Sequence, residues 1–158
     1  MTAVIVSPIL AIAAWFAVNF LGKPILALRE KRLEALQIAE RYSHVSISSS
    51  DALRAAALKS LNDVANALRG ISREQAASTR MWCWLFGYDL EFASRCLFGL
   101  AEGPRGEYSI SPVSGKVTLD ALFVSLGAMS HLSPDDVAVA KREIATTKAT
   151  SATETKSG

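Results

Sequence analysis

The side chains that could carry out chemistry in this chain are few, and they match no reactive pattern. His44 and His131 are the only imidazoles, and neither has another ligand at metal-binding spacing. Gly115-Lys116 resembles part of a phosphate-binding loop, but Val117 stands where a serine or threonine must bind the metal. The sequence therefore predicts no metal site, no cofactor and no phosphate-loop nucleotide site.

The candidate nucleophiles and paired carboxylates also form no catalytic motif. None of the serines lies in a GxSxG sequence, although a triad whose members meet only in space stays open. Asp89 and Glu91 are two residues apart and would point in different directions on a helix, while Asp135 and Asp136 suit the first turn of a helix. We assign no catalytic residue and expect a protein that acts through contacts.

Cys83 and Cys96 are the only cysteines and form no CxxC motif. On one unbroken helix they would lie roughly 20 Å apart, so a disulfide would require a chain reversal near Gly87. If this part of the chain is cytoplasmic, as the charges beside the N-terminal apolar run predict, its thiols stay reduced. We therefore expect two free, buried cysteines.

An uncharged run over residues 3–22 is the clearest element of the sequence. As an α-helix it would rise about 30 Å, the thickness of the hydrocarbon core of a bilayer. No Lys or Arg precedes the run and several follow it, which predicts an external N-terminus and a cytoplasmic body. A cleaved signal peptide is the alternative, but the run lacks a charged n-region.

Two sets of residues near this run are candidate contacts. Four basic side chains follow it and are expected to bind anionic lipid headgroups: Lys23, Arg29, Lys31 and Arg32. Three small side chains share one face of the run and would let another transmembrane helix approach closely: Ser7, Ala11 and Ala14.

The remaining elements are predicted to be helices. Pro24 begins an amphipathic juxtamembrane helix that either packs on its own domain, which its mixed charges favour, or lies at the headgroups. Later helices are expected from Asp51 to a C-terminal Gly70, near Thr118 to Leu132, and from Pro134 to Ala145. The turn-rich residues 103–117 are expected to connect helices. The result is an all-α protein with a transmembrane anchor (1–22), a juxtamembrane helix (23–45), a helical domain (46–145) and a disordered tail (146–158), the bundle having about four or five helices.

The segment from Met81 to Leu100 is the most aromatic part of the chain and predicts one kinked helix or two short ones. A second span is disfavoured, because its three charged side chains would each cost roughly 2.5 to 3.5 kcal/mol in the hydrocarbon. Most of its aromatic residues are expected in the core. Three of them could instead form a docking surface for a partner or a membrane: Trp82, Trp84 and Tyr88.

A further set of residues carries a resemblance: Gly22-Lys23-Pro24-Ile25, Leu28-Arg29, Tyr42, Tyr88-Asp89-Leu90, Ala93, Leu97 and Gly99-Leu100. With them the chain resembles, over most of residues 1–100, small bacterial proteins of unknown function that have one N-terminal span and a cytoplasmic helical domain. The resemblance implies this architecture and a location in the bacterial inner membrane, and it implies no activity. Independently, Tyr88-Asp89-Leu90 suits a helix that restarts after Gly87, with Asp89 as its cap.

Taken together, these features predict a membrane-anchored accessory or scaffold protein that binds membrane lipids and either a membrane-protein partner or a second copy of itself. The 17 basic and 15 acidic residues are too balanced to indicate nucleic-acid binding. Two alternatives stay open. One is a small membrane-tethered enzyme or ligand-binding bundle with a pocket beneath the aromatic segment, and the other is a self-assembling envelope-stress or defence component.

Overall fold

The computed structural model describes residues 10–46, 48–74, 77–105 and 112–154, and within these ranges the chain forms helices and no strands. The elements are η1 (a π-helix, Ala17–Gly22), α2 (Lys23–Tyr42), α3 (Asp51–Glu74), α4 (Ala77–Phe86), α5 (Leu90–Arg105), α6 (Pro112–Ser125), the 3-10 turn η2 (Met129–His131) and α7 (Pro134–Glu154). The all-α class is confirmed. The six helices α2 to α7 differ slightly in number from the predicted bundle.

The N-terminal part of the described chain is one continuous helix, Leu10–Tyr42, which is long and apolar enough to cross a membrane. The α-helix predicted from Pro24 is present as α2, with Pro24 in its first turn, but it continues the preceding helix and is not a new one. Pro24 has no backbone N–H, and its ring would clash with a carbonyl of the preceding α-helical turn. The wider π-helix η1 precedes it, with the Lys23 N–H donating to the Val18 carbonyl five residues back, and so lets the helix continue.

Helix α2 is the axis of the helical body rather than a separate interfacial helix. Leu28, Ala35 and Ala39 are buried on it, and it packs on α3 and contacts α4, α5 and α6. The prediction that α2 packs on its own domain is confirmed. Leu26 and Leu33 of the same helix are exposed.

The main core lies between α3 and α5, which make the most extensive contact in the fold. Leu61, Ala65 and Leu68 are buried on α3 and belong to one hydrophobic cluster with Phe92, Leu97 and other residues of α5. Gly70 does not end α3, which continues to Glu74. A glycine stops a helix only where it takes a left-handed conformation, and Gly70 does not.

The aromatic segment forms two helices, α4 and α5, separated by a chain reversal at Gly87. Gly87 has a φ of +67°, a conformation that glycine adopts without strain. Asp89 then caps α5, because its Oδ1 accepts the Phe92 N–H at 2.9 Å, and its own N–H donates to the Ser125 carbonyl at 2.8 Å. The predicted restart at Asp89 is confirmed.

The C-terminal elements are longer than the sequence predicts. Within the predicted connection 103–117, α5 continues to Arg105 and α6 begins at Pro112, so Gly115 and Lys116 are helical and not a turn. Packing explains part of this difference, since the buried Leu100 and Ala101 hold the end of α5 in the core. Residues 108–110, proposed as a short extended stretch, lie outside the described ranges.

The end of α6 and the start of α7 are each fixed by local contacts. Gly127, at a φ of +69°, ends α6 earlier than expected. Ser133 then caps α7, because its Oγ accepts the Asp136 N–H at 3.2 Å, and Lys116 of α6 donates to Asp136 at 3.1 Å. Helix α7 runs to Glu154, whereas a disordered tail was predicted from residue 146. Thr146 and Thr147 donate to the carbonyls four residues back within it.

Candidate functional site

The outer face of α4 carries a group of exposed large apolar side chains. Met81, Trp84 and Leu85 follow an i, i+3, i+4 spacing that places them on one side of the helix. All three are exposed, with Trp84 at 81% and Leu85 at 61% of their full exposure. Phe86 at the end of the helix is also about half exposed. We call these four residues the α4 apolar face.

The inner face of the same helix is mixed. Ser78 and Thr79 are buried, at 7% and 4% exposure, and the Ser78 Oγ has no hydrogen-bond partner among the described residues. Trp82 and Cys83, further along the helix, are half-buried against the core. Helix α4 therefore has apolar side chains on its outer side as well as against the body, and an apolar outer side is not what water favours for a surface helix.

A cluster of rings fixes α4 relative to α2 and α6. Trp82 packs on Phe86 with ring centroids 4.4 Å apart, and Phe86 stacks on Tyr88 at 5.8 Å. The Arg32 guanidinium lies 5.1 Å from the centre of the Tyr88 ring, and its Nε donates to the Leu126 carbonyl. Trp82 and Tyr88 are thus half-buried supports for α4, whereas Trp84 projects away from the body.

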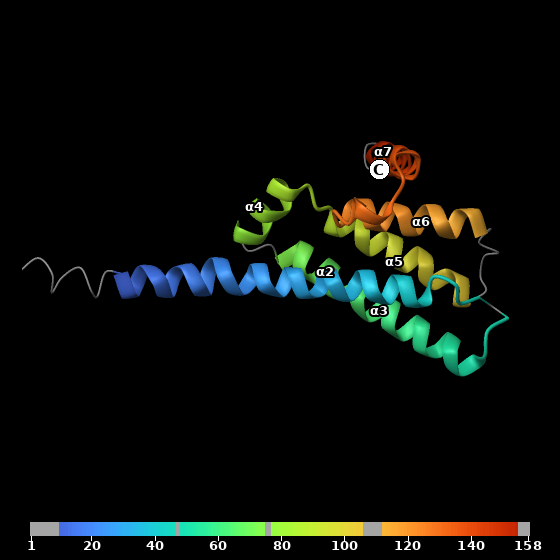
Figure 1. The fold of residues 1–158 in the computed structure, drawn as a ribbon, viewed down its shortest axis with the longest axis horizontal. Coiled ribbons are helices and arrows are strands. Elements are labelled where there is room, and N and C mark those ends of the chain that lie inside the picture. The colour runs from blue at the N-terminus through green and yellow to red at the C-terminus, as the bar shows by residue number, and fades with distance from the viewer. Residues whose placement is uncertain (1–9, 47, 75–76, 106–111, 155–158) are drawn as a thin grey trace, which may run out of the picture.

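Helix α4 lies at the end of the body from which the apolar helix emerges. It contacts both η1 and α2, and Figure 1 shows it beside the long helix where that helix leaves the other elements. Beyond this point the long helix is bare, with exposed Trp15, Phe16 and Phe20 packed on one another at 5.1 to 6.2 Å between ring centroids. Most exposed large apolar side chains of the described chain therefore lie at one end of the molecule.

The predicted headgroup-binding residues divide into two groups. Lys23 and Arg29 are exposed on the helix just after the apolar run. Lys31 is engaged in an ion pair with Glu34 at 2.6 Å, and Arg32 is held by Tyr88 and Leu126 inside the body. The structure therefore leaves Lys23 and Arg29 in a better position for a lipid contact than the other two.

Of the predicted helix-packing face, Ala11 and Ala14 lie on the exposed side of the long helix, and Ser7 lies outside the described residues. Both cysteines are free: Cys96 is buried and Cys83 half-buried. Burial, with a smaller contribution from the Asp89 charge, raises the pKa of each thiol, that of Cys96 to about 12. Both are protonated at neutral pH and are poor nucleophiles.

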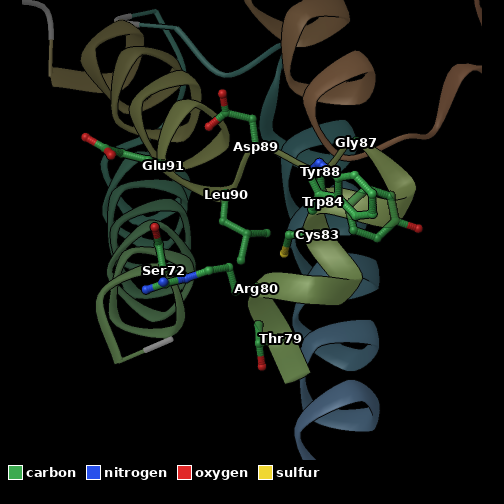
Figure 2. Close-up of a pocket in the computed structure, with 10 residues that line it drawn as sticks. All are labelled: Ser72, Thr79, Arg80, Cys83, Trp84, Gly87, Tyr88, Asp89, Leu90 and Glu91. Atoms are coloured by element: carbon green, nitrogen blue, oxygen red, sulfur yellow. The ribbon is translucent and has the colours of Figure 1, made fainter. Parts of the chain in front are cut away.

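A pocket of about 390 Å³ opens beside α4, between the end of α3 and the start of α5. Figure 2 shows Thr79 and Arg80 toward one end of it and Asp89 toward the other, with Cys83 and Leu90 between. Its acidic side chains already have partners, since Asp89 caps α5 and Glu91 pairs with Arg95 at 2.8 Å. Within the described residues, no group of three or more His, Cys, Asp or Glu side chains could hold a metal ion.

Sequence reasoning identified Trp84 as a surface candidate but missed Met81, Leu85 and Phe86. The signal that could have found them is the placement of Ser78 and Thr79 on the opposite side of the same short helix. Comparison with known proteins adds no further assignment. The chain matches no protein-family model, and searches of curated proteins and of solved structures find no significant match.

Proposed function

We propose that this protein is a single-pass membrane protein whose helical body lies on the cytoplasmic face of a bacterial inner membrane and acts as an accessory or scaffold component, by contacts rather than catalysis. The observation that supports this proposal is the single helix Leu10–Tyr42. Its first part is apolar and bare, and its second part is the axis on which the body packs.

Energetics favour a membrane around the bare part. Leaving a large apolar side chain in water rather than burying it costs roughly 1.5 to 3 kcal/mol. Between Leu10 and Leu21 seven such side chains are exposed: Leu10, Ile12, Trp15, Phe16, Val18, Phe20 and Leu21. A bilayer would cover all of them. It would leave no backbone N–H or C=O group without a hydrogen bond, because the helix makes these bonds internally.

The orientation follows from charge. Lys23 and Arg29 are exposed directly after the apolar run, and basic residues beside a span are retained on the cytoplasmic side. A position at the headgroups also suits them as contacts for anionic lipid. The body, which follows them, is then cytoplasmic.

Cysteine labelling in intact bacterial cells tests this topology. In a background without the two native cysteines, Thr2→Cys and Ser130→Cys mark the two sides of the apolar run. A membrane-impermeant maleimide should label the first in intact cells and the second only after permeabilisation. Extraction of the protein by alkaline carbonate, or equal labelling of both sites in intact cells, would contradict a single span in this orientation.

The accessory role needs a separate experiment. Crosslinking of the full-length protein in membranes, followed by purification in mild detergent and mass spectrometry, should identify a protein partner at fixed stoichiometry. A clean monomer would argue against an accessory subunit. A homo-oligomer would instead support self-assembly, with the exposed Ala11 and Ala14 as the first residues to test in the span.

The pocket beside α4 supports a second candidate function, a small-molecule-binding bundle. Its volume of about 390 Å³ lies within the range of ligand sites, and Arg80 provides a cationic side chain at its edge. A small molecule that copurifies at one per chain and is lost in Arg80→Gln would favour this function. Copurification that is unchanged by this substitution would place the molecule elsewhere.

A further inference from the structure

We propose that the α4 apolar face is a second membrane contact, which lies in the bilayer at the boundary between the lipid headgroups and the acyl chains. This inference rests on the proposed function, because it requires the helix Leu10–Tyr42 to be the span. It adds that the body is not merely tethered but rests on the membrane through one defined helix.

The first argument is the apolar outer side of α4. A short surface helix in water places polar side chains outside and apolar side chains inside. Here Ser78 and Thr79 are inside, and Met81, Trp84 and Leu85 are outside. This arrangement is favourable only if something apolar covers the outer face.

The second argument is the level of α4 along the long helix. Gly22 ends the uncharged run and therefore marks the hydrocarbon boundary. Helix α4 contacts η1, whose last residue is Gly22, and also contacts α2 directly beyond it. A headgroup layer is about 5 to 8 Å thick on each side of the hydrocarbon core, so an element touching η1 lies within or next to that layer.

The third argument is the chemistry of the face. Indole rings prefer the membrane interface, where their apolar body and polar N–H are both accommodated. Arg80 lines the pocket, with its side chain extending toward Ser72 (Figure 2), and so does not contribute to a contact with lipid phosphates. Helix α4 contains no acidic residue that the phosphates would repel.

Exposed apolar side chains elsewhere on the body do not form such a face. Leu26 and Leu33 are seven residues apart on α2, while α3, η2 and α7 carry one each, which is normal for a protein surface: Leu53, Met129 and Val139. Helix α4, by contrast, carries four exposed large apolar side chains within residues 81–86, and it lies beside the end of the apolar run. Covalent continuity with the span therefore favours lipid as the occupant over a soluble partner.

Tryptophan fluorescence of the full-length protein in vesicles of phosphatidylcholine and phosphatidylglycerol tests the inference. Trp15→Phe with Trp82→Phe leaves Trp84 as the only reporter. Phosphatidylcholine brominated on its acyl chains quenches indoles that lie in the bilayer. We expect the emission of Trp84 to be blue-shifted and to lose most of its intensity, with shallow bromines more effective than deep ones.

Two matched variants make the outcomes separable. Trp82→Phe with Trp84→Phe leaves Trp15, which reports the span alone. Val139→Trp, with the three native tryptophans changed to Phe, places a reporter at an exposed position of α7, where we expect neither a blue shift nor quenching. If Trp15 is not quenched, the proposed span fails and this inference fails with it.

If Trp15 is quenched but Trp84 emits as in water and is not quenched, the inference is overturned while the anchor remains. A blue-shifted Trp84 that brominated lipid does not quench, and whose shift disappears as protein is diluted in lipid, means that a second copy covers α4 and also overturns it. Circular dichroism checks that each variant folds. Because Trp82→Phe alters the packing on Phe86, fluorotryptophan labelling of the unsubstituted chain with paramagnetic lipid provides an independent measurement.

Discussion

Two glycines hold the turns that position α4, and they differ in their surroundings. Gly127 has a φ of +69°, and a Cβ atom added there would lie 2.6 Å from the Tyr88 ring. We predict that Gly127→Ala destabilises the body by more than about 1 kcal/mol, because it combines backbone strain with a clash against the ring that supports α4. Chemical unfolding of the full-length protein in detergent measures the change.

Substitutions at Gly87 and Gly70 separate the backbone strain from the clash with the ring. Gly87→Ala adds the strain alone, since nothing lies within 4 Å of its added Cβ at a φ of +67°, and it should cost about 1 kcal/mol. Gly70→Ala adds neither and should stabilise α3 by roughly 0.5 to 1 kcal/mol. If Gly127→Ala were no worse than Gly87→Ala, the Tyr88 ring would be free to move and would not be a fixed support.

Cys96 makes stability dependent on pH in the alkaline range. Its pKa is raised from 9.0 to about 12, mainly by burial, so the folded state keeps the thiol proton that the unfolded state releases. The stabilisation is complete below pH 9.0 and is lost as the pH rises toward 12, by up to about 1.4 kcal/mol per pH unit. We predict that the free energy of unfolding falls more steeply in the native chain than in Cys96→Ala between about pH 9 and pH 11. Parallel slopes in the two proteins would contradict a buried, protonated Cys96.

Residue roles that depend on local sequence were predictable, and those that depend on distant contacts were not. The caps Asp89 and Ser133 follow from their place before a helix, because a cap bonds an N–H only three residues away. Arg32 follows the apolar run and therefore suggested a lipid contact. Its partner, the Leu126 carbonyl, is 94 residues away in the chain, and no pattern near Arg32 indicates it.

At the scale of elements, Pro24 and the π-helix η1 form one unit. We predict that Pro24→Ala converts residues 17–22 to α-helix and stabilises the protein, by up to about 3 kcal/mol, because the lost N–H and the ring clash are the reason for the wider turn. Backbone carbon chemical shifts and amide exchange of Lys23 would show the change. Pro134→Ala is the control, since Pro134 is the first residue of α7 and should have little effect. A π-helix that persists in Pro24→Ala would have another cause, such as its contact with α4.

The type of an element was predictable where its periodic apolar pattern extends over many residues. The ends of elements were not predictable where packing determines them. The α3 stripe, the paired helices α4 and α5 and the start of α7 follow from spacing and caps. The end at Gly70 and the connection at 103–117 were mistaken, because packing outweighs the roughly 1 kcal/mol that a glycine costs inside a helix and because proline is tolerated in a first helical turn, as at Pro112. The exposure of Met81 and Leu85 was missed for a related reason, since the sequence shows two apolar sides of α4 but not which one meets the body.

At the scale of the whole molecule, the continuous helix Leu10–Tyr42 turns two expected parts into one rigid body. The sequence predicted an anchor and a body joined at Pro24. Without a joint there, the height of every element above the membrane is set by its level along this helix. In the proposed membrane arrangement, the position of α4 at the interface is then a consequence of helix length and not of flexible tethering.

Lengthening the helix tests this dependence directly. Four residues, Ala-Glu-Ala-Lys, inserted between Lys23 and Pro24 add about 6 Å of helix. The inserted charges do not enter the hydrocarbon, so the span keeps its place and the body moves outward by nearly the thickness of the headgroup layer. We predict that brominated lipid then quenches Trp15 as before but no longer quenches Trp84. The same four residues inserted after Ser48, in the loop between α2 and α3, leave the level of α4 unchanged and should leave Trp84 quenched. Quenching of Trp84 that survives the first insertion would show that α4 binds the membrane independently of the helix that carries it.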